Sequence, residues 1–244
     1  MALFSSGVGT FIQAKRWGWV GSGLLSINGT SFAFVSVILQ AGAEGGLPLA
    51  CGMALAGGPF QLLLAFFLPQ LREIFTPLVA GVVVLLIGLN LIPVAGYYLS
   101  QGAASHGWER SALTVSSVMG ILIWSQLSKI AWFRMTGPLL AIATGYLISA
   151  FSGQIEWTKA VAAQGLVIPQ LVPHGLDFEW SLLVPFLIIY LVSSIEALGD
   201  LSATANLSGL PTSGKEFWKR LRGGILSDAI TSALAALLNV FPTA

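Results

Sequence analysis

The chain has 244 residues, of which 55% are hydrophobic and 9% are charged. A soluble globular domain carries about a quarter charged residues. The composition, with a mean hydropathy of +0.84, therefore excludes that class and indicates an integral membrane protein. The formal net charge of +1 argues against a nucleic-acid partner, which needs a basic face. The single cysteine, Cys51, excludes an internal disulfide and is expected to be a small buried hydrophobe.

Apolar runs that approach the roughly 20 residues of a bilayer span follow one another along the chain. In chain order we expect helical segments near residues 2–14, 18–41, 47–70, 75–99, 111–128, 135–152, 180–200 and 223–241. The expected fold class is therefore an all-α polytopic membrane protein. Residues 153–179 contain Pro169 and Pro173 and are expected to form an outer loop.

The basic residues indicate an orientation. Nine of the eleven Lys and Arg lie in alternate loops: Lys15, Arg16, Arg72, Lys129, Arg134, Lys215, Lys219, Arg220 and Arg222. By the positive-inside rule these loops are cytoplasmic. The first segment, which is short for a span and is no cleavable signal peptide, then runs from outside to inside. Two explanations stay open: the segment is a re-entrant or frayed element, or an odd number of helices precedes Met1, which would make this orientation natural.

The second segment contains the sequence SINGTSFAFV, in which four small or polar residues, Asn28 to Ser31, interrupt an apolar run. Such residues can break a helix, and hydrocarbon tolerates the break only where it lines a cavity or packs in protein. Secondary transporters use broken helices at a substrate site near the bilayer midplane. Small residues also favour close helix packing, so a broken helix near residues 28–34 and a packing role both stay open.

Three carboxylates lie within apolar sequence and are the strongest candidates for a functional site. Residues 180–195 carry no charge and lead directly to Glu196 and Asp200, which share one helix face at a spacing of four residues. Asp228 lies inside the beginning of the last apolar segment. An ionisable residue within a membrane is costly, so a functional role is the first hypothesis for each of the three.

Structural roles stay open for the same carboxylates. Asp200 could cap its helix or accept bonds from nearby amides, Asp228 could interact with the positive end of a helix dipole, and Glu196 is hardest to explain structurally. His106 and His174 fall in expected outer loops without partners at ligand spacing, so no metal site is expected. The sequence has no nucleophile triad and no phosphate-binding loop, and we expect neither enzyme activity nor a cofactor.

Intramembrane carboxylates beside a broken helix suggest a translocated solute with N–H donors, a coupled cation, or both. A carboxylate can accept paired N–H groups from a planar heterocycle. Phe32 or Phe34 could stack on the face of such a ring. Cation coupling follows from the same chemistry, because a carboxyl group can bind a proton on one side of the membrane and release it on the other. Spacing alone does not name the solute.

Five separated stretches carry a resemblance to a known family: SSGVGTFIQ, GSGLLSINGTSFAFV, TPLVAGVVVLLIGLNLI, SIEALGDLSATA and RLRGGILSDAITSALAALLNVFPT. In order and spacing they resemble the nucleobase/ascorbate transporter family, also called nucleobase:cation symporter 2, and in particular its bacterial xanthine and urate permeases. The resemblance covers almost the whole chain.

The resemblance implies fourteen transmembrane segments in two inverted repeats of seven, divided between a core and a gate domain. On that pattern residues 1–71 resemble core segments two to four, 75–152 gate segments five to seven, and 180–244 core segments eight and nine, with 153–179 as an outer loop. The family's first segment and its segments from the tenth onward have no counterpart here. We therefore expect the chain to be an incomplete fragment that does not transport by itself.

The resemblance also assigns roles to the site residues. Glu196 matches the glutamate that binds the base, and Ser31 and Phe32 lie where the first broken helix touches substrate. Asp200 matches the second acidic position of purine members, where uracil members tend to have His. Asp228 matches an acidic residue that supports the site and its coupling. Ser31 departs from the Asn of some xanthine permeases, so the choice between xanthine and urate stays open.

The expected function is therefore symport of a purine base, xanthine or urate, with a cation, H⁺ or alternatively Na⁺, by elevator-like movement of the core against the gate. We expect a multi-pass protein of the cell (inner) membrane that forms a homodimer through its gate domains. The alternatives are a uracil or other solute permease of the same architecture, such as a sulfate-type carrier, and a non-transporting truncated membrane remnant.

Overall fold

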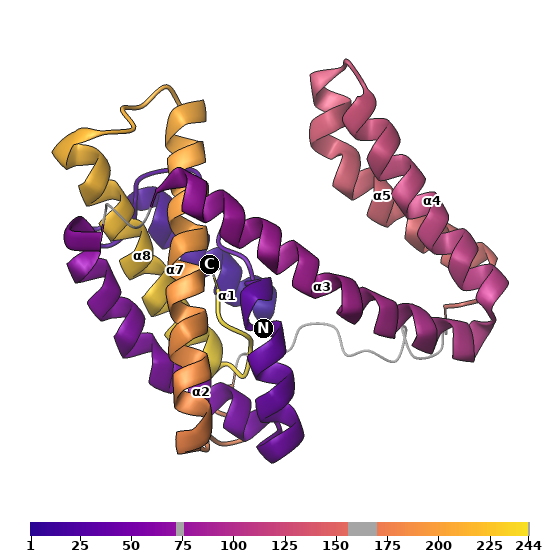
Figure 1. Cartoon of the computed structure of the whole chain (residues 1–244), viewed down its shortest axis with the longest axis horizontal. Coiled ribbons are helices and arrows are strands. Elements are labelled where there is room, and N and C mark those ends of the chain that lie inside the picture. Colours follow the sequence, from indigo (N-terminus) through magenta and orange to yellow (C-terminus); the bar gives the residue numbers. More distant parts are fainter. Residues whose placement is uncertain (72–75, 156–169, 244) are drawn as a thin grey trace. The chain divides into compact units, whose positions relative to one another are not determined.

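The computed structural model describes residues 1–71, 76–155 and 170–243. Within these ranges the secondary structure is helical, with two isolated β-bridges and no strand. The helices are α1 (Ala2–Lys15), the 3₁₀ helix η1 (Phe32–Phe34), α2 (Val35–Leu71), α3 (Pro77–His106), α4 (Trp108–Leu127), α5 (Ala131–Phe151), α7 (Trp180–Leu207) and α8 (Gly214–Leu237) (Figure 1). The predicted all-α class is confirmed.

Three helical stretches of the described residues are long and apolar enough to cross a bilayer: Phe32–Leu68, Leu78–His106 and Trp180–Leu207. Large apolar side chains on them are exposed, among them Leu85 and Ile188. Contiguous apolar surface is rare on soluble monomers and here suits contact with lipid tails. The chain is a membrane-embedded, multi-pass helical protein.

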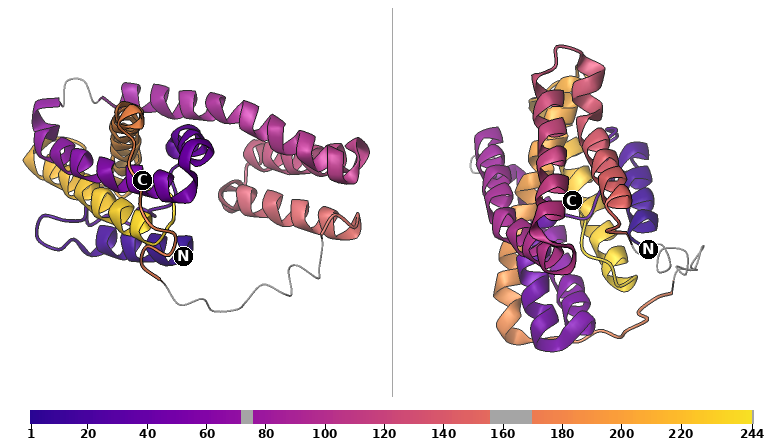
Figure 2. Two further views of the ribbon diagram at one scale, coloured as in Figure 1. Left: turned by 90° about the horizontal axis from the view of Figure 1, so that it is seen from below. Right: turned by 90° about the vertical axis from the view of Figure 1, so that its right-hand side faces the viewer.

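The chain divides into two compact units. Unit 1 joins Met1–Leu89 with Val167–Ala244, and unit 2 is Asn90–Leu166, so α3 begins in one unit and ends in the other. Within unit 2, α4 and α5 lie side by side (Figures 1 and 2). The ring of Trp124 on α4 packs edge-on against Phe133 on α5, with ring centroids 5.0 Å apart.

Four predicted helices match observed ones to within a few residues: those near 2–14, 47–70, 111–128 and 135–152. Three others are correct in kind but too short, because α3 and α7 run past their predicted ends and α8 begins at Gly214. The added turns hold polar residues such as Gln101 and Lys215, which end an apolar run without ending a helix. The outer loop expected at 153–179 lies mostly outside the described residues.

The helix predicted from residue 18 is wrong up to residue 31, because residues 16–31 form no helix. Gly18, Gly21 and Gly23 have φ angles of 60°, 86° and 70°, which L side chains rarely adopt. The N–H of Gly21 donates to the Gly223 carbonyl at 2.7 Å, and that of Gly23 donates to the Gln13 carbonyl at 2.9 Å. Bonds to other elements thus replace the helical bonds that an apolar environment would otherwise require.

The long helix α2 consists of two helical halves that meet at Gly46. Its φ of 72° and ψ of −163° are non-helical, a conformation that glycine adopts without steric cost. This kink lies in the gap between the predicted segments 18–41 and 47–70. The two segments are therefore joined in one bent helix instead of being separated by a loop.

Helices α2, α7 and α8 pack together to form the core of unit 1, and α1 lies alongside α8 (Figure 2). Two buried apolar clusters fill this core, one around Leu68, Leu201 and Ile225 and one around Phe34, Met53, Phe186 and Tyr190. A Cβ on Gly57 would overlap the Tyr190 ring, so glycine permits the close approach of α2 to α7. This packing fixes the positions of the carboxylates on α7 and α8.

Candidate functional site

The extended segment 28–31 is held first by α1. The Asn28 N–H donates to Thr10 Oγ1 at 3.1 Å, and the Ser6 hydroxyl donates to the Asn28 carbonyl. Ser6 and Thr10 lie one turn apart on the same face of α1, so both reach the same backbone unit. Two side chains of the stretch SSGVGT in α1 thereby bond to the N–H and the carbonyl of Asn28, which have no helical partners because this segment is not helical.

The other partner of this segment follows α8. Thr30 forms an antiparallel bridge with Thr243, and the Ser31 N–H donates to the Pro242 carbonyl at 3.0 Å. Two extended pieces of chain, far apart in sequence, therefore meet inside unit 1. Irregular backbone at membrane depth needs such partners.

Glu196 on α7 is bonded to this extended segment. Ser31 Oγ donates to Glu196 Oε2 at 2.9 Å. The Ser31 Oγ atom also accepts a bond from the Ala33 N–H at 3.3 Å, so Ser31 is the N-cap of η1. Ser31 is buried and Glu196 is half-buried. The cap fixes the hydroxyl, and the hydroxyl in turn orients the carboxylate.

Asp228 on α8 is bonded to the other end of the same segment. Asn28 Nδ2 donates to Asp228 Oδ1 at 2.6 Å, and the two residues are 2% and 1% exposed. A buried carboxylate is tolerated only with a hydrogen-bonding or cationic partner. The four residues Asn28 to Ser31 therefore hold two carboxylates from two helices.

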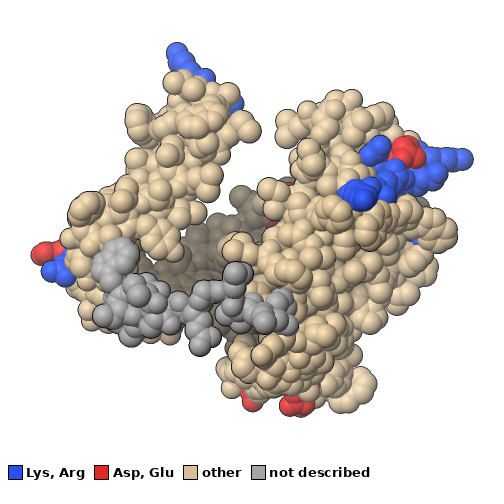
Figure 3. Space-filling view, turned by 180° about the vertical axis from the view of Figure 1, so that it is seen from behind, with Lys and Arg blue, Asp and Glu red and all other residues tan. Residues whose placement is uncertain are grey.

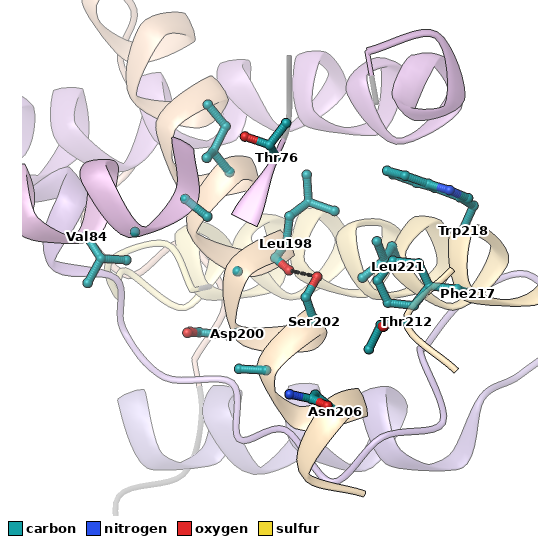
Figure 4. A pocket seen from close by; sticks show the side chains of 15 residues that line it. Thr76, Val84, Leu198, Asp200, Ser202, Asn206, Thr212, Phe217, Trp218 and Leu221 are labelled. Atoms are coloured by element: carbon teal, nitrogen blue, oxygen red, sulfur yellow. Dashed lines mark hydrogen bonds between the residues drawn. The ribbon is translucent and has the colours of Figure 1, made fainter. Parts of the chain in front are cut away.

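Asp200 lies one turn after Glu196 on α7 but is exposed, and it lines a cavity of about 660 Å³ (Figure 4). Glu196 does not line this cavity. The labelled walls come from the start of α3 and the residue before it, the second half of α7, and the start of α8 and the loop before it: Thr76, Val84, Leu198, Asp200, Ser202, Asn206, Thr212, Phe217, Trp218 and Leu221. Asp200 therefore lies on the same face of α7 as Glu196 and also lines this mostly apolar cavity.

The two candidate aromatic side chains behave differently. Phe32 is 63% exposed, whereas Phe34 is fully buried and packs edge-on against Tyr190 with ring centroids 4.8 Å apart. Tyr190 Oη in turn donates to the Ala54 carbonyl at 2.6 Å. Phe34 is therefore a core residue, and Phe32 is the ring that remains accessible beside Ser31.

Two structural interpretations of the carboxylates are wrong. Asp200 cannot cap the end of α7, because the helix continues to Leu207. Asp228 cannot interact with the N-terminal dipole of its helix, because α8 begins at Gly214, several turns earlier. Their positions inside helices remove the simplest explanations that do not involve function.

Sequence reasoning missed the role of Asn28. The residue was noted only as part of the helix break, although a buried amide is a natural donor to a buried carboxylate. No sequence signal links positions that lie 200 residues apart, so the pairing with Asp228 required the fold. Among the described residues no cluster of His, Cys, Asp and Glu could hold a metal ion, and Cys51 is buried as expected.

A carboxylate on a membrane-length helix, held by a non-helical segment, is typical of membrane transport proteins. A family model described as the Permease family matches residues 1–244. The chain belongs to this family.

Curated relatives agree with this assignment. Xanthine permease XanP of Escherichia coli (strain K12) is 37% identical over 257 residues, covering 99% of this chain and 56% of XanP. Xanthine permease XanQ of the same strain is 32% identical, covering 99% of this chain and 55% of XanQ. Uric acid permease PucJ of Bacillus subtilis (strain 168) is 30% identical, covering 98% of this chain and 54% of PucJ.

The chain spans about half the length of the curated relatives it matches. The resemblance to bacterial xanthine and urate permeases predicted from the sequence is confirmed. These relatives are permeases and not enzymes, which also confirms the expectation that the chain is not an enzyme.

Proposed function

We propose that the chain serves the cation-coupled transport of a purine base, xanthine or urate. The observation that carries this proposal is the 2.9 Å bond from Ser31 Oγ to Glu196 Oε2, which sets a carboxylate of a membrane-length helix beside a non-helical segment. Membership of the Permease family supports transport, and relatives named as xanthine and uric acid permeases support a purine substrate.

Glu196 would bind the base. Its Oε2 accepts from Ser31, and among the described residues no side chain donates to Oε1. The free oxygen can accept an N–H group of a planar heterocycle, and such charge-assisted bonds are roughly twice as strong as neutral ones. The exposed ring of Phe32, adjacent to Ser31, would pack against the face of the base.

Asp200 and Asp228 would support this site and its coupling to H⁺, with Na⁺ as the alternative. Glu196 and Asp200 share one face of α7, where like charges repel, so a proton bound by either one stabilises the pair. Asp228 would hold the extended segment through Asn28 while the site opens and closes. A carboxyl group that gains and loses a proton as its access alternates can drive a symporter.

The proposed architecture is that of an inverted-repeat transporter, with residues 1–71 and 180–244 in a core domain and 75–152 in a gate domain. In support, unit 1 joins residues from both ends of the chain, as a core interrupted by a gate requires, although the boundary between the units falls after Leu89. We expect the core domain to move against the gate domain as an elevator and the gate domains to form a homodimer. The protein would lie in the inner membrane, with residues 153–179 as an outer loop.

The test is uptake of radiolabelled xanthine by a bacterial strain without purine permeases that expresses the complete reading frame encoding this chain. We expect saturable uptake that unlabelled xanthine or urate inhibits and that a protonophore abolishes. Sulfate and uracil should leave uptake unchanged. If the protein is present in the membrane fraction and no purine accumulates, or if uracil or sulfate is taken up instead, the proposal is wrong.

A further inference from the structure

Two segments far apart in the sequence form one strongly basic end of unit 1. Contacts between the end of α1, the following turn and the start of α8 bring six basic residues to this end: Lys15, Arg16, Lys215, Lys219, Arg220 and Arg222. Figure 3 shows Lys and Arg side chains gathered on this part of the surface. Among the described residues one carboxylate lies within this group, because Arg16 Nη1 donates to Glu216 Oε1 at 2.7 Å. We call the six basic residues, together with the exposed Trp17 and Trp19, the basic face. It carries a large excess of positive charge.

The backbone under the basic face is fixed by close contacts. Trp17 and Val20 exchange two backbone hydrogen bonds of 2.8 and 3.0 Å, which close a tight turn. The N–H of Gly21 donates to the Gly223 carbonyl at 2.7 Å, and a Cβ on Gly223 would overlap the Gly21 carbonyl. The turn is thereby docked on α8 and holds its two tryptophans in place.

The cations of the basic face fall into two groups. The arginines make contacts within the protein: Arg220 donates to the Ser22 carbonyl at 3.2 Å, and the Arg222 guanidinium lies 4.3 Å from the ring centroid of Phe66 and 5.5 Å from that of Trp19. The three lysines, Lys15, Lys215 and Lys219, are exposed, although Lys15 Nζ also lies 5.5 Å from the ring centroid of Phe11 and 5.7 Å from that of Trp17. The arginines therefore join the segments, and the lysines present charge to the surroundings.

The basic face and a pair of exposed carboxylates flank opposite ends of α7. It surrounds the start of α8, just after the C-terminal end of α7, whereas the exposed acidic residues Asp177 and Glu179 precede the N-terminal end of α7. The 28 residues of α7 span about 42 Å at 1.5 Å per residue. A bilayer with its headgroups is about 40–45 Å thick. The two ends of unit 1 thus reach opposite headgroup layers with opposite charge.

We propose that the basic face is a binding site for the headgroups of anionic phospholipids. The exposed lysines would contact lipid phosphates, and Trp17 and Trp19, which are 57% and 75% exposed, would lie at the depth where aromatic side chains collect in bilayers. The bound lipids join α1 to α8 on the side that the positive-inside rule assigns to the cytoplasm. This inference does not depend on the substrate of the permease.

The test uses the purified protein, expressed from its complete reading frame, in neutral detergent micelles. Brominated phosphatidylglycerol and brominated phosphatidylcholine are added separately, and the quenching of tryptophan fluorescence is measured. We expect phosphatidylglycerol to quench at lower concentration, and the Lys15→Gln, Lys215→Gln, Lys219→Gln triple variant to lose this preference, with apparent affinity lower by about 100-fold.

The matched control removes three cations elsewhere, by Arg110→Gln, Lys129→Gln and Arg134→Gln in unit 2, and should keep the preference. Replacing the three lysines of the basic face by arginine should also keep it, which separates loss of charge from loss of fold. The proposal is overturned if the two lipids quench alike, if both Gln variants lose the preference equally, or if inorganic phosphate at matched ionic strength displaces the lipid, which would indicate a site for free phosphate.

Discussion

Replacing Glu196 by Gln is expected to lower xanthine uptake by about 100-fold, from the loss of a charge-assisted hydrogen bond. Glutamine keeps the size of the side chain and can still accept from Ser31. Its amide, however, carries no charge, and its NH₂ group is a donor that would face an N–H donor of the base without a hydrogen bond. The measurement is the initial rate of uptake, corrected for the amount of protein in the membrane fraction.

The matched control for this substitution is Glu44→Gln. Glu44 is exposed and accepts a bond from Gln40 Nε2 at 3.1 Å, one turn earlier on α2, so the same chemical change there leaves the site intact. Uptake by this variant should equal that of the unmodified protein. Full uptake by the Glu196→Gln variant, or an equal loss in both variants, would show that Glu196 does not bind the base.

Replacing Asn28 by Ala is expected to destabilise the protein by about 3 kcal/mol, because it removes a hydrogen-bond donor from the buried carboxylate of Asp228. For a chain of this size that corresponds to a fall of about 6–12 °C in the midpoint of thermal unfolding. The midpoint can be followed in detergent by the loss of the monodisperse peak in size-exclusion chromatography.

A double-mutant cycle separates this bond from other effects of the substitution. When Asp228 is replaced by Asn, the charge is absent, and a further Asn28→Ala change should cost much less than it does in the unmodified protein. Asn206→Ala, which truncates an exposed asparagine on α7, should change the midpoint little. If the two changes at positions 28 and 228 are simply additive, the bond does not stabilise the fold.

The sequence predicts most helices of this chain because their apolar residues must be solvated by lipid or buried. The same criterion underestimates their length, since α3, α7 and α8 extend into polar turns such as that of Lys215, which continue a helix outside hydrocarbon. It also fails for residues 16–31, where hydropathy resembles that of a span. There the positive φ angles of Gly21 and Gly23 and bonds to α1 and α8 decide the conformation.

The acidic residues of the candidate site, and Ser31 through the resemblance, can be named from the sequence, but the hydrogen bonds that join them cannot. Glu196 and Asp228 stand out in sequence because an uncompensated carboxylate in an apolar segment is costly. Their hydrogen-bond partners Ser31 and Asn28 lie 165 and 200 residues away, a separation that no local pattern bridges. The different surroundings of Phe32 and Phe34 likewise follow from packing against Tyr190, not from composition.

The most direct test of the proposed purine site is the protection of a cysteine introduced by Phe32→Cys. The native Cys51 is buried, and the labelling of the unmodified protein by N-ethylmaleimide is subtracted, so that the difference reports on the introduced thiol. Saturating xanthine should slow this reaction, while the reaction of a Glu44→Cys variant, at an exposed position on α2 with no bond to Glu196, Ser31 or Phe32, stays unchanged. If xanthine leaves the modification rate of the Phe32→Cys variant unchanged although the protein takes up xanthine, the base binds elsewhere and the site proposed around Glu196, Ser31 and Phe32 is wrong.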